Sequence, residues 1–486
     1  MTTKTDYEMV VGLEVHCQLA TRTKLFCACG TDGFGETANT RVCPVCTGQP
    51  GTLPVLNKRA VELAFQAALA LDCRLAEESV FARKNYFYPD LPKAYQISQY
   101  ERPFSTDGGL DVALKDGRVK RVRIHRVHLE EDAGKLLHEI GSKRLDYSLV
   151  DFNRGGAPLI EIVSEPDLRS SEEAYAYLTA LKEVLQHAGC SRCDMEKGEM
   201  RCDANVSLRA RGRGELGTRA ELKNLNSFKG VKDALEYEFR RQAALLDSGR
   251  RVVQETRLWD AQRQETRSMR SKEEAHDYRY FPDPDLAPLR AAPEWVAALK
   301  ASLPELPAAK RQRFQSQHAL SAYDASVLAS DRELAEYFER ALSGLPGGAK
   351  TLANLVINEL LGKLNAEKMT AGRCPVPAES LGELARLVQA GTLSSKGAKD
   401  VLARMWESGK PAAVLVAELG VSQVSDDAQL RDWIEQALRA QPQAAADLKS
   451  GKERAIGSLV GVVMKLSKGK ANPARVNVLI KEAVSR

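Results

Sequence analysis

The 486-residue sequence contains no run that approaches the ~20 consecutive apolar residues needed to span a bilayer. Its first residues, MTTKTDYEMV, lack the apolar core of a signal peptide. We therefore expect a cytoplasmic protein without a membrane partner, whose cysteines are thiols or metal ligands rather than disulfides. The chain is too long for one compact core, so two to three domains are expected.

Two enzyme motifs are also missing. Residues 344–351, GLPGGAKT, nearly match a phosphate-binding P-loop, but Ala349 stands where the second glycine is required and a helical segment precedes it. No G-x-S-x-G nucleophile elbow occurs, and no Ser/Lys hydrolase pattern is evident. The sequence therefore shows no nucleophile for hydrolysing an amide.

The net charge of +5 is unevenly distributed. Residues 448–486 hold nine Lys or Arg and two Glu, so this segment carries +7 and the remainder about −2. A basic end on a near-neutral body indicates an anionic partner, for which nucleic acid is the first candidate. A solvated, solubilising tail explains the charge equally well.

The pattern of the chain changes near residue 295. Before it, short alternating runs, glycine turns and a few helices predict an α+β domain on a largely antiparallel sheet. The proline-rich stretch 281–293 then forms a border or a crossing loop, because proline cannot continue a helix or a central strand. Later residues follow a 3.6-residue period. We predict a sheet domain over 1–295, an all-α domain over 296–405 and a small α-helical tail domain over 406–486.

Several helix ends can be assigned from capping residues. Asn57 is expected to cap a helix over 58–71, and the capping box SSEE at 170–173 opens another that ends at Gly189. In the tail, apolar stripes predict two helices joined by residues 467–473. Asn472 can cap the second of these, with Pro473 at its first position.

Three predicted strands place polar side chains on one face. In residues 10–19, Glu14 and His16 oppose Val11, Leu13 and Val15. The strands at 201–208 and 219–225 add four more polar side chains in the same way, Asp203, Asn205, Glu221 and Lys223. Such a face suits a hard cation and a phosphate. The alternative is an ordinary solvated sheet surface.

Two further segments could extend this site. Residues 125–132, HRVHLEED, place Glu130 and Glu131 at the end of a probable strand. Residues 83–99 interleave Arg83, Lys84 and Tyr86 with prolines, a mixture that suits contacts to phosphate and to a base or sugar. Carboxylates paired with local arginines and a loop with aromatic anchors remain the alternatives.

Four cysteines form two close pairs, Cys27 with Cys29 and Cys43 with Cys46, separated by a glycine-rich loop. This spacing predicts a tetrahedral thiolate site for structural zinc, with no open position for water. Unliganded thiols or a redox pair are the alternatives. Cys190, Cys193 and Cys202 are explained equally well as buried thiols.

The longer motifs resemble one family. They are VGLEVH (11–16), residues 83–99, HLEEDAGK (128–135), SLVDFNRGGAPLIEIVSEPD (148–167), MRCDANVSL (200–208), AELKNLNS (220–227), DYRYFPDPD (277–285) and SKGKANPARVN (467–477). Together they resemble the GatB/GatE family, whose GatB members belong to the tRNA-dependent amidotransferase GatCAB, with a YqeY-type tail. The resemblance covers essentially the whole chain.

The resemblance implies a ligase that forms a carbon–nitrogen bond. In GatCAB, ATP phosphorylates the side-chain carboxylate of misacylated Glu-tRNA(Gln) or Asp-tRNA(Asn), and ammonia then displaces the phosphate to give the amide. The ammonia comes from glutamine hydrolysed by the partner GatA, and GatC bridges the two other proteins. A non-discriminating aminoacyl-tRNA synthetase could join them in a transamidosome. This division of labour would account for the missing amidase nucleophile.

The resemblance also implies roles for individual residues. Glu14, His16 and Glu131 would surround Mg²⁺, with Glu130 and Glu221 close by, and Asp203, Asn205 and Lys223 would orient metal or substrate. Candidates for ATP contact are Arg83, Lys84, Tyr86 and Ser98. Cys27, Cys29, Cys43 and Cys46 match a zinc pattern found in part of the family. Lys468, Lys470 and Arg475 are candidates for tRNA phosphate contacts.

Two other hypotheses remain. A tRNA-binding scaffold without chemistry of its own would leave the acidic face as an empty solvated surface. A GatE-type paralogue would need an extra inserted domain, for which the chain is too short.

Overall fold

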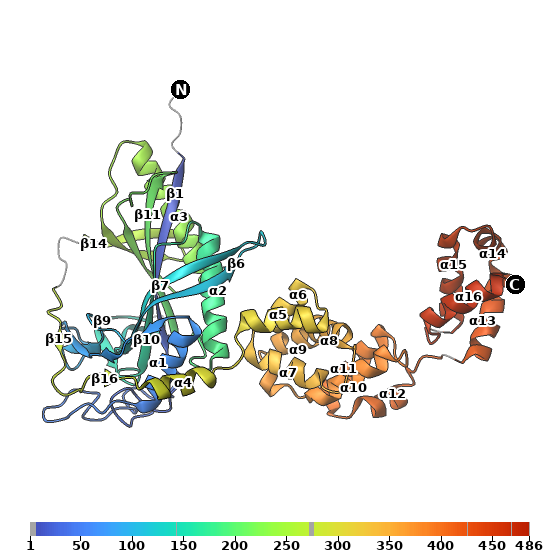
Figure 1. Cartoon of the computed structure of the whole chain (residues 1–486), viewed down its shortest axis with the longest axis horizontal. Coiled ribbons are helices and arrows are strands. Elements are labelled where there is room, and N and C mark those ends of the chain that lie inside the picture. Colours follow the sequence, from blue (N-terminus) through green and yellow to red (C-terminus); the bar gives the residue numbers. More distant parts are fainter. Residues whose placement is uncertain (1–5, 142, 272–276, 425, 468, 486) are drawn as a thin grey trace. The chain divides into compact units, whose positions relative to one another are not determined.

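The computed structural model describes residues 6–141, 143–271, 277–424, 426–467 and 469–485. They form two compact units that divide between Leu306 and Pro307, each with its own hydrophobic clusters (Figure 1). Within the described residues, no helix has both the length and the apolar character required to span a membrane.

A nine-stranded sheet organises the first unit, in the order β14-β13-β12-β11-β1-β10-β7-β6-β2. All neighbours are antiparallel except β12 and β13, so the expected α+β fold on a largely antiparallel sheet is confirmed. The strands are β1 (Tyr7–Gln18), β2 (Arg74–Leu75), β6 (Ser105–Ala113), β7 (Val119–Glu131), β10 (Pro158–Ser164), β11 (Met200–Ala210), β12 (Ala220–Leu225), β13 (Glu255–Asp260) and β14 (Glu265–Ser271).

Three helices complete the core of this unit: α1 (Lys58–Ala70), α2 (Ser171–His187) and α3 (Phe228–Asp247). The predicted cap of α1 is confirmed, since the Asn57 side chain accepts hydrogen bonds from the amides of Arg59 and Ala60. Ser170 caps α2 as predicted, but the Glu173 carboxylate reaches back to the amide of Arg169. The helices leave the opposite, polar face of the sheet to other side chains, because Val11, Leu13 and Val15 of β1 are buried in the core.

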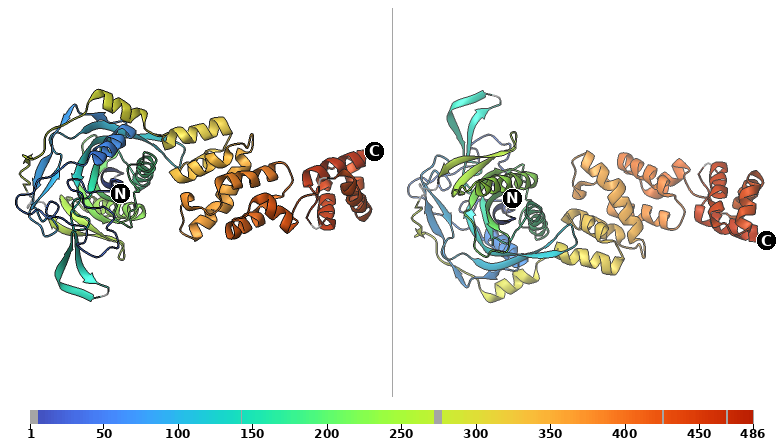
Figure 2. Two further views of the ribbon diagram at one scale, coloured as in Figure 1. Left: turned by 90° about the horizontal axis from the view of Figure 1, so that it is seen from below. Right: turned by 90° about the horizontal axis from the view of Figure 1, so that it is seen from above.

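Smaller sheets surround the large one. β15 (Phe281–Pro282), β4 (Ala82–Asn85) and β5 (Tyr95–Ser98) form one, and β16 (Leu289–Arg290) pairs with β3 (Glu78–Ser79). β8 (Lys135–Ile140) and β9 (Lys143–Asp151) form a hairpin that projects from the unit in both views of Figure 2. The proline-rich stretch therefore returns to the first unit. The helix α4 (Pro293–Ala301) does so too, with the Trp295 ring 5.1 Å from that of Phe65.

The second unit is helical. Its elements are α5 (Pro307–His318), α6 (Ala322–Leu328), α7 (Arg332–Leu342), α8 (Ala349–Leu355), the π-helical turn η2 (Val356–Leu360), α9 (Leu361–Ala366), the 3₁₀ turn η3 (Ala371–Arg373), α10 (Ala378–Gln389), α11 (Ser395–Ser408), α12 (Ala412–Leu419), α13 (Asp427–Ala440), α14 (Pro442–Lys449), the 3₁₀ turn η4 (Glu453–Ala455), α15 (Ile456–Leu466) and α16 (Pro473–Ser485). One hydrophobic cluster runs from Phe314 to Val416 and another from Leu430 to Ile480. Asn472 caps α16 as predicted, by accepting from the amides of Ala474 and Arg475.

Candidate catalytic face and metal centres

The polar face of the large sheet gathers side chains from five adjacent strands. His16 of β1 lies opposite Glu161 of β10, and Glu161 lies opposite His128 of β7, so these three residues form one row across the sheet. On the other side of β1, Asp203 pairs with Glu14. Strand alternation therefore brings together residues that are up to 191 positions apart in sequence.

His16, Glu130 and Glu161 form the centre of this face. One ligand atom from each lies within 4.8 Å of the others. The Nε2 atom of His16 is 3.3 Å from a Glu161 oxygen and 3.5 Å from a Glu130 oxygen, and His128 Nε2 lies at the same two distances from these carboxylates. Burial alone would lower the pKa of His128, but the charge of Glu161 and the hydrogen bond to Glu130 raise it to about 9. Without a cation, the two imidazoles balance the two carboxylates.

Glu14 lies beside this centre and is less well compensated. Its carboxylate accepts a hydrogen bond from Asn205 at 2.8 Å. Burial raises the pKa of Glu14, and the charges of Glu161, Glu221 and Asp203 raise it further. A carboxyl held against its neighbours in this way gains from a bound cation, which would stabilise its charged form. This property of the donor set fits a hard divalent ion.

Lys223 closes the face on its other side. Its ammonium lies 2.6 Å from Asp203 and 3.0 Å from Glu221. Its pKa is raised, because these two carboxylates outweigh the effect of burial. A cavity of about 600 Å³ opens next to this area and is lined by Glu14, Asn205 and Arg219, among others. Its size suits a small substrate or the end of a larger one.

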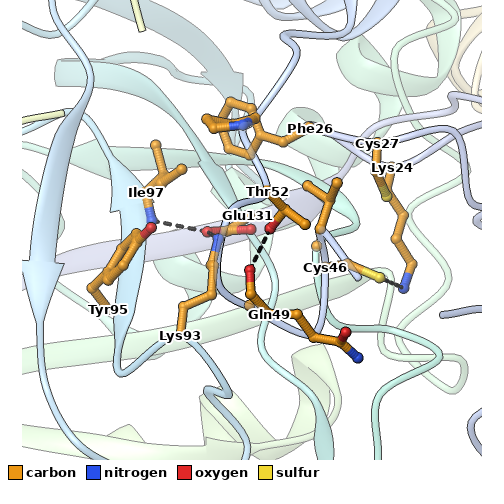
Figure 3. A pocket seen from close by; sticks show the side chains of 14 residues that line it. Lys24, Phe26, Cys27, Cys46, Gln49, Thr52, Lys93, Tyr95, Ile97 and Glu131 are labelled. Atoms are coloured by element: carbon orange, nitrogen blue, oxygen red, sulfur yellow. Dashed lines mark hydrogen bonds and ion pairs between the residues drawn. The ribbon is translucent and has the colours of Figure 1, made fainter. Parts of the chain in front are cut away.

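Glu131 faces a different environment from Glu130. The structure places its carboxylate against the Lys93 ammonium and the Ile97 amide, in the pocket that Figure 3 shows. Among the described residues it does not belong to the group of His16, Glu130 and Glu161. The reason is strand alternation, since consecutive residues of β7 point to opposite sides.

The four predicted zinc ligands converge beside the same pocket. One sulfur from each of Cys27, Cys29, Cys43 and Cys46 lies within 4.8 Å of the others. The Cys46 sulfur accepts hydrogen bonds from the Cys43 amide at 3.2 Å and from the Lys24 ammonium at 3.5 Å. Hydrogen bonds from Cys27 and from the Cys43 amide, together with the charge of Lys24, lower the pKa of Cys46 to about 4. The site is consistent with structural zinc.

The other cysteines do not form a second site of this kind. Cys190, Cys193 and Cys202 are buried, and among the described residues they do not bring three ligand atoms together. Cys193 instead contacts Cys17, with 3.5 Å between the sulfurs.

The predicted nucleotide contacts are only partly gathered at the centre. Ser98 reaches it, because its hydroxyl donates to Glu130 at 3.2 Å. Arg83 is paired with Asp283 at 2.8 Å and with Asp285 at 3.0 Å. Lys84 lies 5.0 Å from the centre of the Tyr278 ring, and the Tyr86 ring lies 6.0 Å from that same ring.

The predicted tRNA contacts lie in the tail. Lys470 is exposed, whereas Arg475 pairs with Asp427 at 2.7 Å on the surface. Lys468 lies outside the described residues.

Sequence reasoning missed two members of the central group, Glu161 and His128. Glu161 stands alone as a carboxylate in the apolar run PLIEIV, which is a recognisable signal for a functional side chain in a strand. His128 precedes the two glutamates by two and three positions and shares the face of Glu130. Which strand lies next to which could not be read from the sequence.

Comparison with known proteins identifies relatives over nearly the whole chain. Residues 9–297 match the family model described as "GatB/GatE catalytic domain", and residues 336–484 match the "GatB domain" model. The chain is 52% identical to a protein of Carboxydothermus hydrogenoformans, over 99% of both chains, and 50% identical to one of Persephonella marina, over 98% of this chain and 99% of the relative. Both relatives are named as the GatB-type component of an aspartyl/glutamyl-tRNA(Asn/Gln) amidotransferase.

Proposed function

We propose a function from one premise: the chain belongs to the GatB/GatE family. It is a subunit of a tRNA-dependent amidotransferase, a ligase of protein biosynthesis. Its substrates would be misacylated Glu-tRNA(Gln) and Asp-tRNA(Asn), and its partners a GatA-type glutaminase and a bridging protein of the GatC type. A non-catalytic scaffold is disfavoured, because residues 9–297 match a catalytic domain.

The observation that carries the chemistry is the group of His16, Glu130 and Glu161 beside the strained carboxyl of Glu14. A carboxylate must be activated before ammonia can attack it. In the proposed reaction a side-chain oxygen of the aminoacyl group bonds to the γ-phosphorus of ATP, and ADP leaves. Ammonia then attacks the acyl carbon, and phosphate departs as the amide forms.

Mg²⁺ fits this donor set. His16, Glu130, Glu161 and Glu14 would hold it, and it would neutralise phosphate charge when bound. Glu131, which the resemblance placed in the shell, would have to exchange its contact with Lys93 to reach the ion. His16 would serve as a neutral ligand or act through water.

The protein's own side chains position the reactants. Asn205 fixes Glu14 by a hydrogen bond, and Lys223 holds Asp203 and Glu221 together. Ser98 connects the 83–99 segment to Glu130, so nucleotide contacts by Arg83, Lys84 and Tyr86 would be coupled to the acidic centre. Such positioning lowers the barrier by holding the reacting groups in line.

The remaining parts of the chain would bind rather than react. We propose that four thiolates around zinc stabilise the loops over residues 27–56. We also propose that the helical unit grips tRNA, with Lys468, Lys470 and Arg475 contacting phosphates. We assign 1–295, 296–405 and 406–486 to the catalytic, helical and tail functions respectively.

The test is Glu14→Gln in a complex reconstituted with both partner proteins. We expect ATP-dependent phosphorylation of the misacylated tRNA to be lost, while tRNA binding and glutamine hydrolysis are retained. Glu8→Gln is the matched control, since Glu8 lies on the same strand and pairs with Arg209 instead. Normal amide formation by Glu14→Gln would contradict the site assignment.

A further inference from the structure

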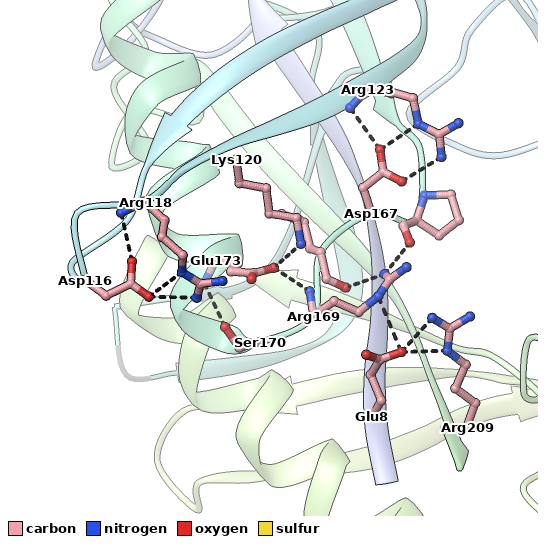
Figure 4. Close-up of polar contacts among 12 residues, drawn as sticks. Glu8, Asp116, Arg118, Lys120, Arg123, Asp167, Arg169, Ser170, Glu173 and Arg209 are labelled. Carbon is pink, nitrogen blue, oxygen red and sulfur yellow. Dashed lines mark hydrogen bonds and ion pairs between the residues drawn. The ribbon is translucent and has the colours of Figure 1, made fainter. Parts of the chain in front are cut away.

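Strand β7 carries a series of basic side chains, and Arg126 differs from the others. Those at positions 120, 121, 123 and 125 each have a carboxylate partner: Lys120 with Glu173 at 2.7 Å, Arg121 with Asp111 at 3.3 Å, Arg123 with Asp167 at 2.7 Å and His125 with Glu165 at 3.0 Å. Figure 4 shows the pairs of Lys120 and Arg123. Among the described residues Arg126 has no ion-pair partner, and its Nε is buried without a hydrogen-bond partner.

Arg126 lies on the catalytic face. It precedes His128 by two residues on the same strand, so its side chain leaves the sheet on the same side. It pairs with Val163, which in turn pairs with Glu14, and both of these line the 600 Å³ cavity. The row of Arg126 is therefore adjacent to the row of His16, Glu161 and His128.

An aromatic stack holds the guanidinium. Its central carbon lies 5.7 Å from the centre of the Tyr100 ring. Tyr100 is stacked on Tyr280, with 4.2 Å between ring centres and an angle of 9°. The charges of Glu130 and Glu161 add to the effect of burial in raising the pKa of Tyr280, so the stack stands beside the acidic centre. Stacking fixes the plane of the guanidinium but leaves its N–H groups free to donate.

The neighbouring carboxylates do not satisfy this cation. Glu130 and Glu161 are engaged by His16 and His128 instead. A guanidinium withdrawn from water without an anion is unfavourable, and its planar fork matches the oxygens of a phosphate. We propose that Arg126 binds the phosphoryl group during its transfer from ATP to the aminoacyl carboxylate, and that Tyr100 positions it. This inference rests on the proposed function.

The test measures ADP formation and nucleotide binding by the reconstituted complex with Mg²⁺ and misacylated tRNA. We expect Arg126→Gln to lower kcat for ADP formation by about 100-fold or more, because a donor to the transition state is lost. KM for the tRNA should be nearly unchanged. Arg126→Lys keeps the charge without the fork, so its kcat should be intermediate. Arg121→Gln, a surface change on the same strand, is the control.

A second measurement separates this role from a structural one. ADP with aluminium fluoride imitates the phosphoryl group in transit, so the wild-type complex should bind it more tightly than ADP alone. Arg126→Gln should lose that gain by about tenfold or more while binding ADP alone as the wild type does. An equal loss of affinity for both ligands, an unchanged kcat, or a selective rise in KM for the tRNA would overturn the assignment. Amide formation by the wild type without ADP release would instead refute the proposed function.

Discussion

Zinc binding to the four-cysteine site should release at least two protons near neutral pH. Before zinc binds, burial and the hydrogen bond to Cys43 raise the pKa of Cys29 to about 11. The hydrogen bond to Cys46, together with burial, raises the pKa of Cys27 well above its usual value. Both thiols are therefore protonated at pH 7. Cys46, with its pKa of about 4, is already a thiolate and releases none.

The proton count sets the pH dependence of zinc affinity. Because zinc binds thiolates, each proton released makes the logarithm of the association constant rise by one per pH unit. The affinity should therefore fall by at least about 100-fold for each unit that the pH drops between about 8 and 5. Cys46 adds nothing to this slope, because it stays ionised throughout the range.

Isothermal titration calorimetry of the zinc-stripped protein gives the number directly. Titrations in two buffers with different ionisation enthalpies yield the protons released per zinc. Cys43→Ser should weaken binding sharply, because a tetrahedral site loses a ligand. Cys374→Ser, which changes a half-buried thiol outside the site, should leave both values unchanged. Release of fewer than about two protons, or equal zinc binding by Cys43→Ser, would refute the reasoning.

Three other predictions concern the catalytic face, the helical core and an ion pair. Glu161→Gln should reduce ADP formation by about 100-fold with tRNA binding intact, and activity near the wild-type level would remove Glu161 from the site. Phe338→Ala should lower the free energy of unfolding of the second unit by about 3–5 kcal/mol in urea, because its fully buried ring packs 5.3 Å from Phe314; the exposed Tyr323→Ala is the control. Burial alone would raise the pKa of Glu339, but hydrogen bonds from Lys310 and Arg313 lower it overall. Its carboxylate therefore contributes stability above its unfolded pKa and loses it as the pH falls through the folded one, so the stability difference between wild type and Glu339→Gln should shrink from about pH 5 to about pH 3. A constant difference across that range would contradict the pairing.

Local features of the fold were predictable because they depend on neighbours in sequence. Asn57, Ser170 and Asn472 cap the helices that their positions predicted, since a side-chain oxygen needs only the amides two or three residues later. The alternating burial of β1 follows from its period-two pattern in the same way.

The make-up of the catalytic centre was less predictable. Glu130 and Glu131 are adjacent in sequence, yet only Glu130 joins His16, because the strand turns the two carboxylates to opposite sides. Glu161 enters the group only because β10 lies between β1 and β7. The pairing order of strands is a long-range property, which no local pattern encodes.

By itself the sequence determined the class of chemistry and the family, through long motifs and cysteine spacing that need no coordinates to recognise. Only the tertiary structure decided which of its many carboxylates share one centre, and which basic residue of β7 lacks an acid partner. The physical reason is that ionic and metal contacts act over a few ångströms. Five strands from distant parts of the chain must pair in register before such distances exist.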